Sequence, residues 1–299
     1  MKYRVIHRTQ YLYSAQVGLC RNEACLLPRN TDRQVCLTSQ LQIDPQPSDL
    51  RERRDSFGNR ISHFSVQQAH EKLQVTATSE VSTSPREANI LELGNGLSWE
   101  AVRNHLLSEK SQAVLEALPF LYDSPMIREA HLLTEFARPS FGQERPLGEA
   151  VADLMQRIYR EFKYDPGYTT IATPLSEVLA NRRGVCQDFA HLGIASLRAM
   201  GLAARYVSGY IETLPPPGQE RLIGADASHA WFSVYTPAVG WIDFDPTNNQ
   251  IPDQQHITVA WGRDFSDVSP LKGVALGGGK HKVIVSVDVA RLEDSVVSS

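Results

Sequence analysis

The sequence predicts an α+β protein, in which an antiparallel β domain precedes a second domain of mixed helices and strands. Three observations support this class. Residues 1 to about 95 alternate between polar and apolar side chains with a period of two, which is typical of half-buried strands. Helical spacing then dominates to about residue 200. Strands separated by short turns return after that point.

Composition limits the classes of function. The 299-residue chain is long enough for about two domains, and its 42% hydrophobic and 21% charged residues are ordinary for a globular protein. A net charge of −4 gives no electrostatic reason to expect nucleic acid or an anionic membrane as a partner. The first residues contain no apolar run of signal-peptide length, and no stretch approaches the roughly 20 apolar residues of a membrane helix. We therefore expect a cytoplasmic protein.

The four cysteines are too sparse for a disulfide scaffold. Cys20, Cys25 and Cys36 lie far from Cys186 along the chain. No Cys-x-x-Cys or His-x-x-x-His pair has the spacing of a metal site, and the glycine-rich run 277–280 precedes a strand rather than the helix of a phosphate loop. We expect free thiols, no metal and no cofactor.

The β domain is predicted over residues 1–95. Turn residues at 28–32 and 55–59 separate its strands, which favours antiparallel pairing. Two runs alternate most clearly and predict one buried apolar face each: Val35, Leu37, Leu41 and Ile43 in the first, and Leu73, Val75, Ala77 and Val81 in the second.

Helices are predicted after the β domain. Residues 96–145 have helical spacing interrupted by prolines, and we interpret them as a connector. The second domain is predicted over 146–270 and starts with an amphipathic helix that has Pro146 in its first turn. A short helix with Pro174 as its first residue follows and ends at Gly184.

The run from Phe189 to Met200 is apolar nearly all round, which predicts a buried helix closed by Gly201. Cys186 lies just before this run. At a helix N-terminus the unpaired N–H groups and the helix dipole favour a thiolate, and the same groups could hold an oxyanion. Taken alone, however, the cysteine could equally be a small buried filler residue.

Strands are predicted on both sides of an exposed loop after this helix. The first covers residues 204–211, and the loop is the proline-rich run 215–218. The C-terminal segment 271–299 begins with glycine-rich sequence and contains a last alternating strand at 283–289.

Two further strands, 228–235 and 241–245, are joined by a short turn and predict a hairpin. Alternation lets His229 and Asp245 lie side by side on it. With Cys186 they have the types and order of a Cys-His-Asp triad. His229 would accept the thiol proton, the thiolate would attack an amide or acyl carbonyl, and Asp245 would fix the imidazole. Many chains contain these residue types in this order, so the spacing is weakly specific.

Three motifs resemble those of the transglutaminase-like superfamily, in the same order: Arg183-Gly184-Val185-Cys186-Gln187-Asp188-Phe189, Ser228-His229-Ala230-Trp231 and Gly240-Trp241-Ile242-Asp243-Phe244-Asp245-Pro246-Thr247. Residues 7–11, 26–29, 262–270 and the closing strand resemble bacterial transglutaminase-like proteins, so the resemblance covers nearly the whole chain. It implies a papain-like core over 146–270, in which a helix bearing the cysteine packs on an antiparallel sheet bearing the histidine and aspartate.

The resemblance also implies which aspartate completes the triad. It is Asp245, the aspartate of the Asp-Pro-Thr motif, which leaves Asp243 as a polar strand residue. Four further residues are candidates for substrate or oxyanion contacts: Gln187, Asp188, Trp231 and Arg263. Asp188 also has a structural alternative as a first-turn acid, and Arg263 could simply form a surface ion pair with Asp264.

The resemblance implies a cysteine acyl-transfer enzyme that acts on amide bonds of peptides or proteins through a thioester acyl-enzyme. Water as acceptor would make it a peptidase or amidase, and an amine would make it a transglutaminase. A non-catalytic peptide-binding or scaffold protein is the second hypothesis. An arylamine-acetyltransferase-like role is disfavoured by the N-terminal domain, and a peptide N-glycanase role by the lack of zinc-binding cysteine pairs. The sequence does not predict the oligomeric state.

Overall fold

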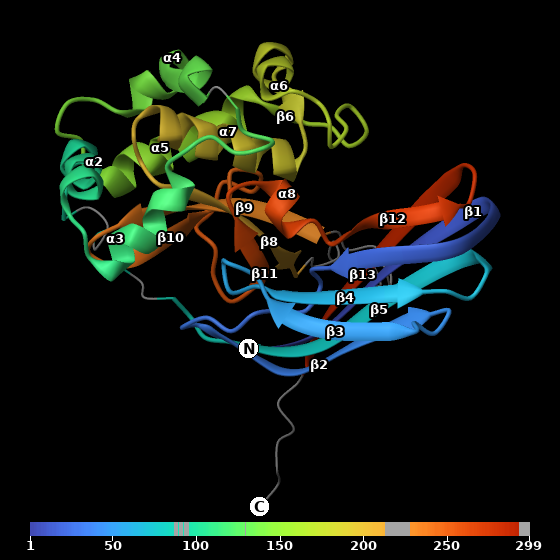
Figure 1. Ribbon diagram of the computed structural model, residues 1–299. Coiled ribbons are helices and arrows are strands. Elements are labelled where there is room, and N and C mark those ends of the chain that lie inside the picture. The colour runs from blue at the N-terminus through green and yellow to red at the C-terminus, as the bar shows by residue number, and fades with distance from the viewer. Residues whose placement is uncertain (87–88, 90–91, 93–95, 129, 213–227, 293–299) are drawn as a thin grey trace, which may run out of the picture.

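The computed structural model describes the chain except for residues 87–88, 90–91, 93–95, 129, 213–227 and 293–299. Figure 1 shows a β domain on one side and, on the other, a layer of helices over a second sheet, which confirms the predicted α+β class. The predicted loop at 215–218 lies outside the described residues. Among the helices that are described, none is long and apolar enough to cross a membrane.

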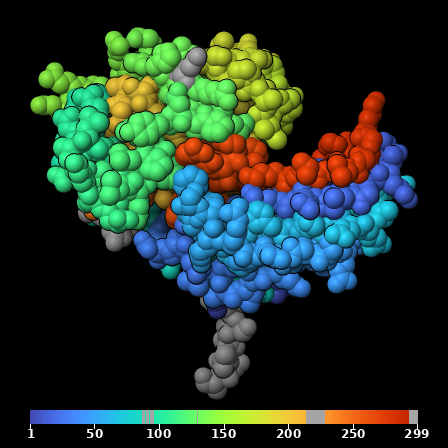
Figure 2. Space-filling view, viewed as in Figure 1, coloured from blue at the N-terminus to red at the C-terminus, as the bar shows by residue number. Residues whose placement is uncertain are grey.

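The N-terminal domain is a seven-stranded antiparallel sheet. Its strands are β1 (Lys2–Ala24), β2 (Gln34–Asp44), β3 (Asp49–Arg54), β4 (Arg60–Val66), β5 (His70–Thr83), β12 (Leu271–Gly277) and β13 (His281–Leu292). They run in the order β2-β5-β1-β4-β3, and β12 and β13 both pair with β1. Figure 2 shows these C-terminal strands lying along the first strand. The predicted strand at 283–289 is confirmed within β13, and the glycine-rich sequence before it forms another strand.

Only one of the two predicted apolar faces is fully confirmed. The β5 face is buried at all four positions: Leu73, Val75, Ala77 and Val81. On β2, Ile43 is buried, but Val35 and Leu37 are about half exposed, at 51% and 50%. The pairing of β2 with β5 shifts register between Cys36 and Thr38. β2 is also the edge strand, and a bulge at an edge lets the alternation change faces.

Short helices occupy the segment between the first five strands and the core. They are α2 (Trp99–Ser108), α3 (Gln112–Ala117), η1 (Leu118–Phe120), η2 (Ala130–Leu133), α4 (Thr134–Ala137) and η3 (Arg138–Ser140). α2 starts at Ser98, whose hydroxyl accepts a hydrogen bond from the N–H of Ala101 at 3.3 Å. The helix buries Trp99 and Val102 against the core.

The core contains α5 (Leu147–Glu161), α6 (Leu175–Asn181), α7 (Cys186–Ala199), α8 (Phe265–Val268) and a two-stranded parallel pair, β6 (Lys163–Tyr164) and β7 (Arg183–Gly184). Pro146 and Pro174 occupy N-cap positions, one residue earlier than predicted. α6 ends at Asn181 and is capped by Arg182, whose φ of 54° is left-handed, so the predicted end at Gly184 is three residues late.

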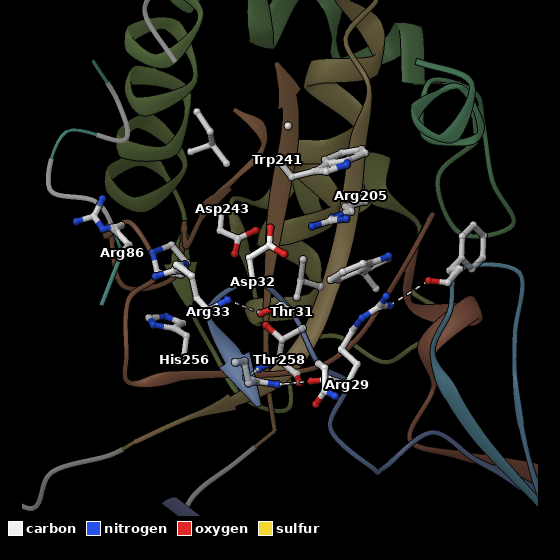
Figure 3. Close-up of a pocket in the computed structure, with 18 of the residues that line it drawn as sticks. Arg29, Thr31, Asp32, Arg33, Arg86, Arg205, Trp241, Asp243, His256 and Thr258 are labelled. Atoms are coloured by element: carbon white, nitrogen blue, oxygen red, sulfur yellow. Dashed lines mark hydrogen bonds between the residues drawn. The ribbon is translucent and has the colours of Figure 1, made fainter. Parts of the chain in front are cut away.

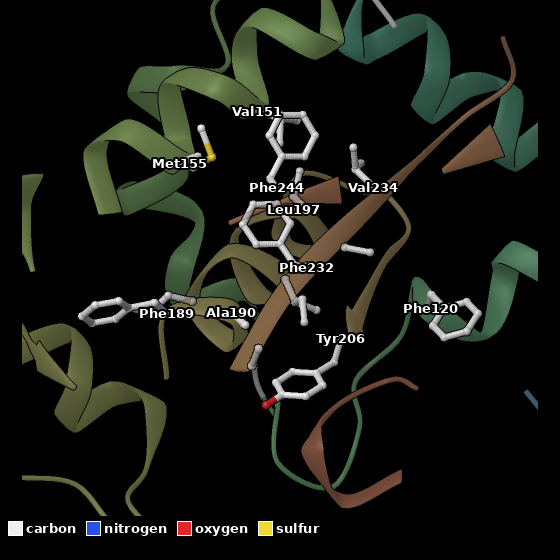
Figure 4. Close-up of a cluster of buried hydrophobic side chains, with 14 of the residues drawn as sticks. Phe120, Val151, Met155, Phe189, Ala190, Leu197, Tyr206, Phe232, Val234 and Phe244 are labelled. Atoms are coloured by element: carbon white, nitrogen blue, oxygen red, sulfur yellow. The ribbon is translucent and has the colours of Figure 1, made fainter. Parts of the chain in front are cut away.

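A four-stranded antiparallel sheet lies under α7. It is formed by β8 (Ala204–Ile211), β9 (Ser228–Thr236), β10 (Gly240–Phe244) and β11 (His256–Gly262), in the order β10-β9-β8-β11. The predicted β9–β10 hairpin is confirmed. Figure 4 shows Phe232, Phe244, Tyr206 and Leu197 gathered in the apolar layer between helix and sheet. A Cβ on Gly193 of α7 would lie 2.4 Å from the Phe232 ring, so glycine permits this close packing.

Candidate active site

The first turn of α7 is built around Asp188. Its carboxylate accepts hydrogen bonds from the N–H of Val185 at 2.8 Å and from the hydroxyl of Thr169 at 2.6 Å. Burial raises the pKa of this carboxyl in spite of both bonds. A Cβ on Gly184 would lie 2.7 Å from the Asp188 carboxylate, so the turn requires glycine there. These contacts start the helix at Cys186, where the first N–H groups have no intrahelical partner.

His229 and Asp245 are brought together at the end of the β9–β10 hairpin. His229 Nε2 lies 2.8 Å from Asp245 Oδ2, and both side chains are buried. This bond leaves His229 Nδ1 as the ring nitrogen available to Cys186, which lies close enough to raise the pKa of the imidazole. His229 and Asp245 therefore meet directly, and Cys186 lies in their neighbourhood.

The Asp245 carboxylate is held by its own chain segment. Oδ1 accepts hydrogen bonds from the N–H groups of Thr247 at 3.0 Å and Asn248 at 3.2 Å, which forms an Asx turn. The Asn248 amide donates to Oδ2 at 2.8 Å and lies 3.3 Å from His229 Nε2. Proline at 246 suits this turn, so the run from Asp245 to Asn248 fixes the carboxylate towards the imidazole.

His256, the first residue of β11, was not among the predicted site residues. Its Nε2 lies 3.1 Å from Asp245 Oδ2, the same oxygen that bonds His229. Burial lowers the pKa of His256, so the neutral ring donates from Nε2. Its Nδ1 is buried and has no partner in the described part of the chain. No local motif marks this histidine, since its role depends on a strand at the far edge of the sheet.

The pKa values of His229 and Asp245 are shifted in opposite directions. Burial lowers the pKa of His229, but the hydrogen bonds and negative charges of Asp245 and Cys186 outweigh burial and raise it to about 10. Burial likewise opposes ionisation of Asp245, yet the hydrogen bonds from His229 and His256 hold its pKa far below the usual range. The carboxylate is therefore charged, and the imidazole holds a proton at neutral pH.

Tyr206 is a second residue that the sequence did not indicate. It lies on β8 facing α7 and is 2% exposed (Figure 4). Burial, followed by the negative charges of Cys186 and Asp188, raises the pKa of its phenol well above the ordinary value. The hydroxyl thus remains a hydrogen-bond donor in the neighbourhood of the Cys186 sulfur.

The other predicted residues lie around the triad in different ways. Gln187 is half-buried in the first turn of α7. Trp231 is fully buried, with its ring centroid 6.0 Å from that of His229 and 5.2 Å from that of His256. Trp231 therefore packs against both histidine rings. Arg263 pairs with Asp267 at 2.9 Å, rather than with its neighbour Asp264.

Asp243 follows the interpretation of a polar strand residue. It is paired with Ser233 across the hairpin and accepts a hydrogen bond from the Ser233 hydroxyl. His229, Asp245 and His256 also offer one metal-ligand atom each within 4.8 Å of one another. Both histidine Nε2 atoms already bond Asp245, so hydrogen bonding accounts for this cluster.

Two family models match the chain. Residues 3–82 match the bacterial transglutaminase-like N-terminal region, and residues 134–246 match the transglutaminase-like superfamily. The second match spans Cys186, His229 and Asp245 and ends one residue after the aspartate. The first match therefore lies in the β domain, and the second covers the part of the core up to the turn that follows Asp245.

Similar proteins agree with these matches. An uncharacterized protein of Mycobacterium tuberculosis is 47% identical over 98% of this chain and 93% of its own length. A protein-glutamine gamma-glutamyltransferase of Pseudomonas aeruginosa is 31% identical over 52% of this chain and 23% of that protein. The crystal structure of a candidate cysteine protease from Cytophaga hutchinsonii, 24% identical, superimposes with a TM-score of 0.77 over 99% of this chain and 92% of that one. The last likeness establishes the shared fold.

Proposed function

The chain belongs to the transglutaminase-like superfamily, and from this premise we propose that it is a cysteine acyl-transfer enzyme acting on amide bonds of peptides or proteins. The single observation that carries the proposal is the His229 imidazole, which is hydrogen-bonded to the buried Asp245 carboxylate and whose pKa both Asp245 and Cys186 raise. A raised histidine pKa beside a thiol favours a thiolate–imidazolium pair, which is the reactive form of cysteine enzymes.

The first half of the reaction transfers the acyl group to sulfur. The Cys186 proton passes to His229 Nδ1, and the thiolate attacks the amide carbonyl carbon to form a C–S bond. The carbonyl oxygen becomes an oxyanion that the first N–H groups of α7 can stabilise, with the Tyr206 hydroxyl as a further donor. His229 then gives its proton to the leaving nitrogen as the C–N bond breaks. The products are a thioester and a free amine or ammonia.

The second half releases the acyl group. His229, now neutral, removes a proton from water or from an amine, which attacks the thioester carbonyl. The C–S bond breaks, and the proton on His229 restores the thiolate–imidazolium pair. Asp245 keeps the imidazole oriented throughout and stabilises its positive charge. Water gives hydrolysis, whereas an amine gives a new amide, as the name of the protein-glutamine gamma-glutamyltransferase of Pseudomonas aeruginosa implies for that relative.

The test is a panel of glutamine-containing peptides incubated with the protein, with and without a primary amine, and followed by mass spectrometry. Ammonia loss, peptide cleavage and amine addition each have a distinct mass change. We expect one of the three with the native chain and none with Cys186→Ser. Matched folding of the two proteins is checked by circular dichroism.

The alternative is a non-catalytic peptide-binding or scaffold protein that uses the same site without turnover. It predicts that peptides bind equally to the native chain and to Cys186→Ser and leave both unmodified. That result over a broad panel, together with the absence of a trapped thioester after acid quenching, would contradict the proposed enzyme.

A further inference from the structure

A large cleft separates the β domain from the core. Its volume is about 1240 Å³, which is ample for a ligand larger than a single amino acid. The β-domain wall contains Arg29, Asp32 and Arg33, and the core wall contains Arg205 and Asp243. Figure 3 shows these labelled side chains around the cleft. The core wall is the face of the four-stranded sheet that α7 does not cover.

Guanidinium and indole groups stack along this wall. Arg29 lies over the Trp261 ring, with 3.1 Å between its Cζ and the ring centroid. The Cζ of Arg205 lies 3.8 Å from the Trp261 centroid and 4.3 Å from that of Trp241. Arg205 is therefore held between two tryptophans, in a geometry that favours the cation. This stacking fixes the plane of the Arg205 guanidinium, called the Arg205 fork below.

The Arg205 fork has few partners. The side chain is buried, at 9% exposure, and burial lowers its pKa to about 9, so it remains charged at neutral pH. Within the described residues its one hydrogen bond is long, from Nε to the Ser233 hydroxyl at 3.4 Å, and it forms no ion pair. Its remaining N–H groups line the cleft, where a ligand can accept hydrogen bonds from them.

Two carboxylates in the same cleft limit the kind of ligand that can bind there. Asp243 bonds the Ser233 hydroxyl through Oδ1, and its charge acts on Arg205 without pairing with it. Asp32 is exposed and forms no hydrogen bond with the residues that the structure describes. The cleft thus presents both signs of charge, since Arg29, Arg33 and Arg86 line it as well. A ligand that carries both charges satisfies both groups.

We propose that this interdomain cleft binds a short zwitterionic peptide, with its carboxylate on the Arg205 fork and its ammonium group near Asp243 and Asp32. A guanidinium binds a carboxylate through two parallel N–H donors, which suits the fixed plane of Arg205. The volume of the cleft accommodates the peptide backbone. The site does not depend on turnover at Cys186.

Isothermal titration calorimetry of the full chain carrying Cys186→Ala, which cannot turn peptides over, tests this site. The probes are trialanine, N-acetyl-trialanine, which lacks the ammonium group, and trialanine amide, which lacks the carboxylate. We expect trialanine to bind, and each analogue to bind about tenfold more weakly, as loss of one charge-assisted contact implies.

Substitutions of residues that line the cleft test whether the peptide binds there. Arg205→Gln should weaken trialanine about tenfold while leaving the weak trialanine amide unchanged. Asp32→Asn leaves the stack intact, so it tests the site even where Arg205→Gln fails to fold, and it should weaken trialanine but not N-acetyl-trialanine. Arg51→Gln, at an exposed arginine of β3 paired with Asp49, is the matched control and should bind as the parent does. No binding of trialanine, equal binding of all three probes, or affinity unchanged in Asp32→Asn would overturn the proposal.

Discussion

The two faces of the four-stranded core sheet differ in chemistry although they alternate along the same strands. The face under α7 presents Phe232 and Phe244, whose rings stack with centroids 5.7 Å apart. The opposite face presents Ser233 and Asp243, at the next register position of the same hairpin, together with Arg205 of β8. One face is packed against a helix, and the other lines a cavity.

In this sheet, the side chains that stabilise the packing of α7 lie on one face, and the charged side chains lie on the other. Side chains under α7 hold the helix in place by burial of apolar surface, and so fix where Cys186 lies. Side chains on the other face carry charges whose burial is costly to folding and is retained for hydrogen bonding and binding. His229 lies where β9 begins, at the end of the sheet, which lets it reach both the thiol and Asp245. Substitutions on the α7 face should therefore lower the free energy of unfolding, and substitutions on the polar side should lower kcat/KM.

The largest effect is expected from Asp245→Asn on the polar side. The amide keeps the size of the side chain but removes the charge that holds the His229 proton, so we expect turnover to fall by about 10³–10⁴-fold. The measurement is kcat/KM on the amide substrate that the peptide panel identifies. A loss of less than about tenfold would show that His229 does not need the carboxylate.

On the apolar face the effect should appear in stability. Phe232→Ala removes a fully buried ring that contacts α7 at Gly193, and we expect it to lower the free energy of unfolding by about 3–5 kcal/mol. Asp243→Asn, on the next register position of the opposite face, should change it by less than about 1 kcal/mol, because the amide oxygen still accepts from Ser233. Urea denaturation monitored by circular dichroism measures both, and equal losses would erase the distinction between the faces.

Substitutions of His256 test whether turnover depends on a residue beyond the three motif residues. His256→Phe keeps a ring against Trp231 but removes the hydrogen bond to Asp245, and we expect about a tenfold loss in kcat/KM. His256→Gln restores a donor and should recover most of the rate. If Phe and Gln at this position lower kcat/KM equally, His256 acts only through packing.

A further prediction concerns the dependence of stability on pH. The pKa of His229 is raised in the folded chain from its ordinary 6.5 to about 10, so folding favours the protonated ring. The stability contributed by this proton is fully present below pH 6.5 and is lost as the pH rises through 10. The native chain should lose more stability between pH 7 and pH 10 than His229→Gln does, as measured by urea denaturation at each pH. Parallel losses would contradict the raised pKa.

Local sequence signals predicted the elements that position the site. The apolar run after Cys186 and the alternation around His229 gave the helix and the hairpin, since each element buries a face that follows its own period. The helix begins three residues before the apolar run because the Asp188 carboxylate caps it. Motif order then indicated the triad, and the structure brings His229 and Asp245 into hydrogen-bonding contact.

Features that depend on distant pairing were not predictable in this way. The strands at 271–277 and 281–292 complete the N-terminal sheet through β1, at the opposite end of the chain. His256 reaches Asp245 only because β11 pairs with β8. Arg29 and Arg205 share Trp261 across the interface between domains. Periodicity describes one segment at a time, whereas each of these contacts joins segments that the fold alone brings together.

The most direct test of the central claim compares the thiols of the folded chain. Cys186 and Cys36 are both partly exposed, while Cys20 and Cys25 are buried, so Cys36 is the control for accessibility. Iodoacetamide is added at pH 7, and the labelling rate of each cysteine is followed by peptide mass spectrometry. We predict that Cys186 reacts much faster than Cys36, because thiolate is the reactive form, and that His229→Ala slows Cys186 alone. Equal rates for Cys186 and Cys36, unchanged by His229→Ala, would contradict the assignment of Cys186 as the nucleophile.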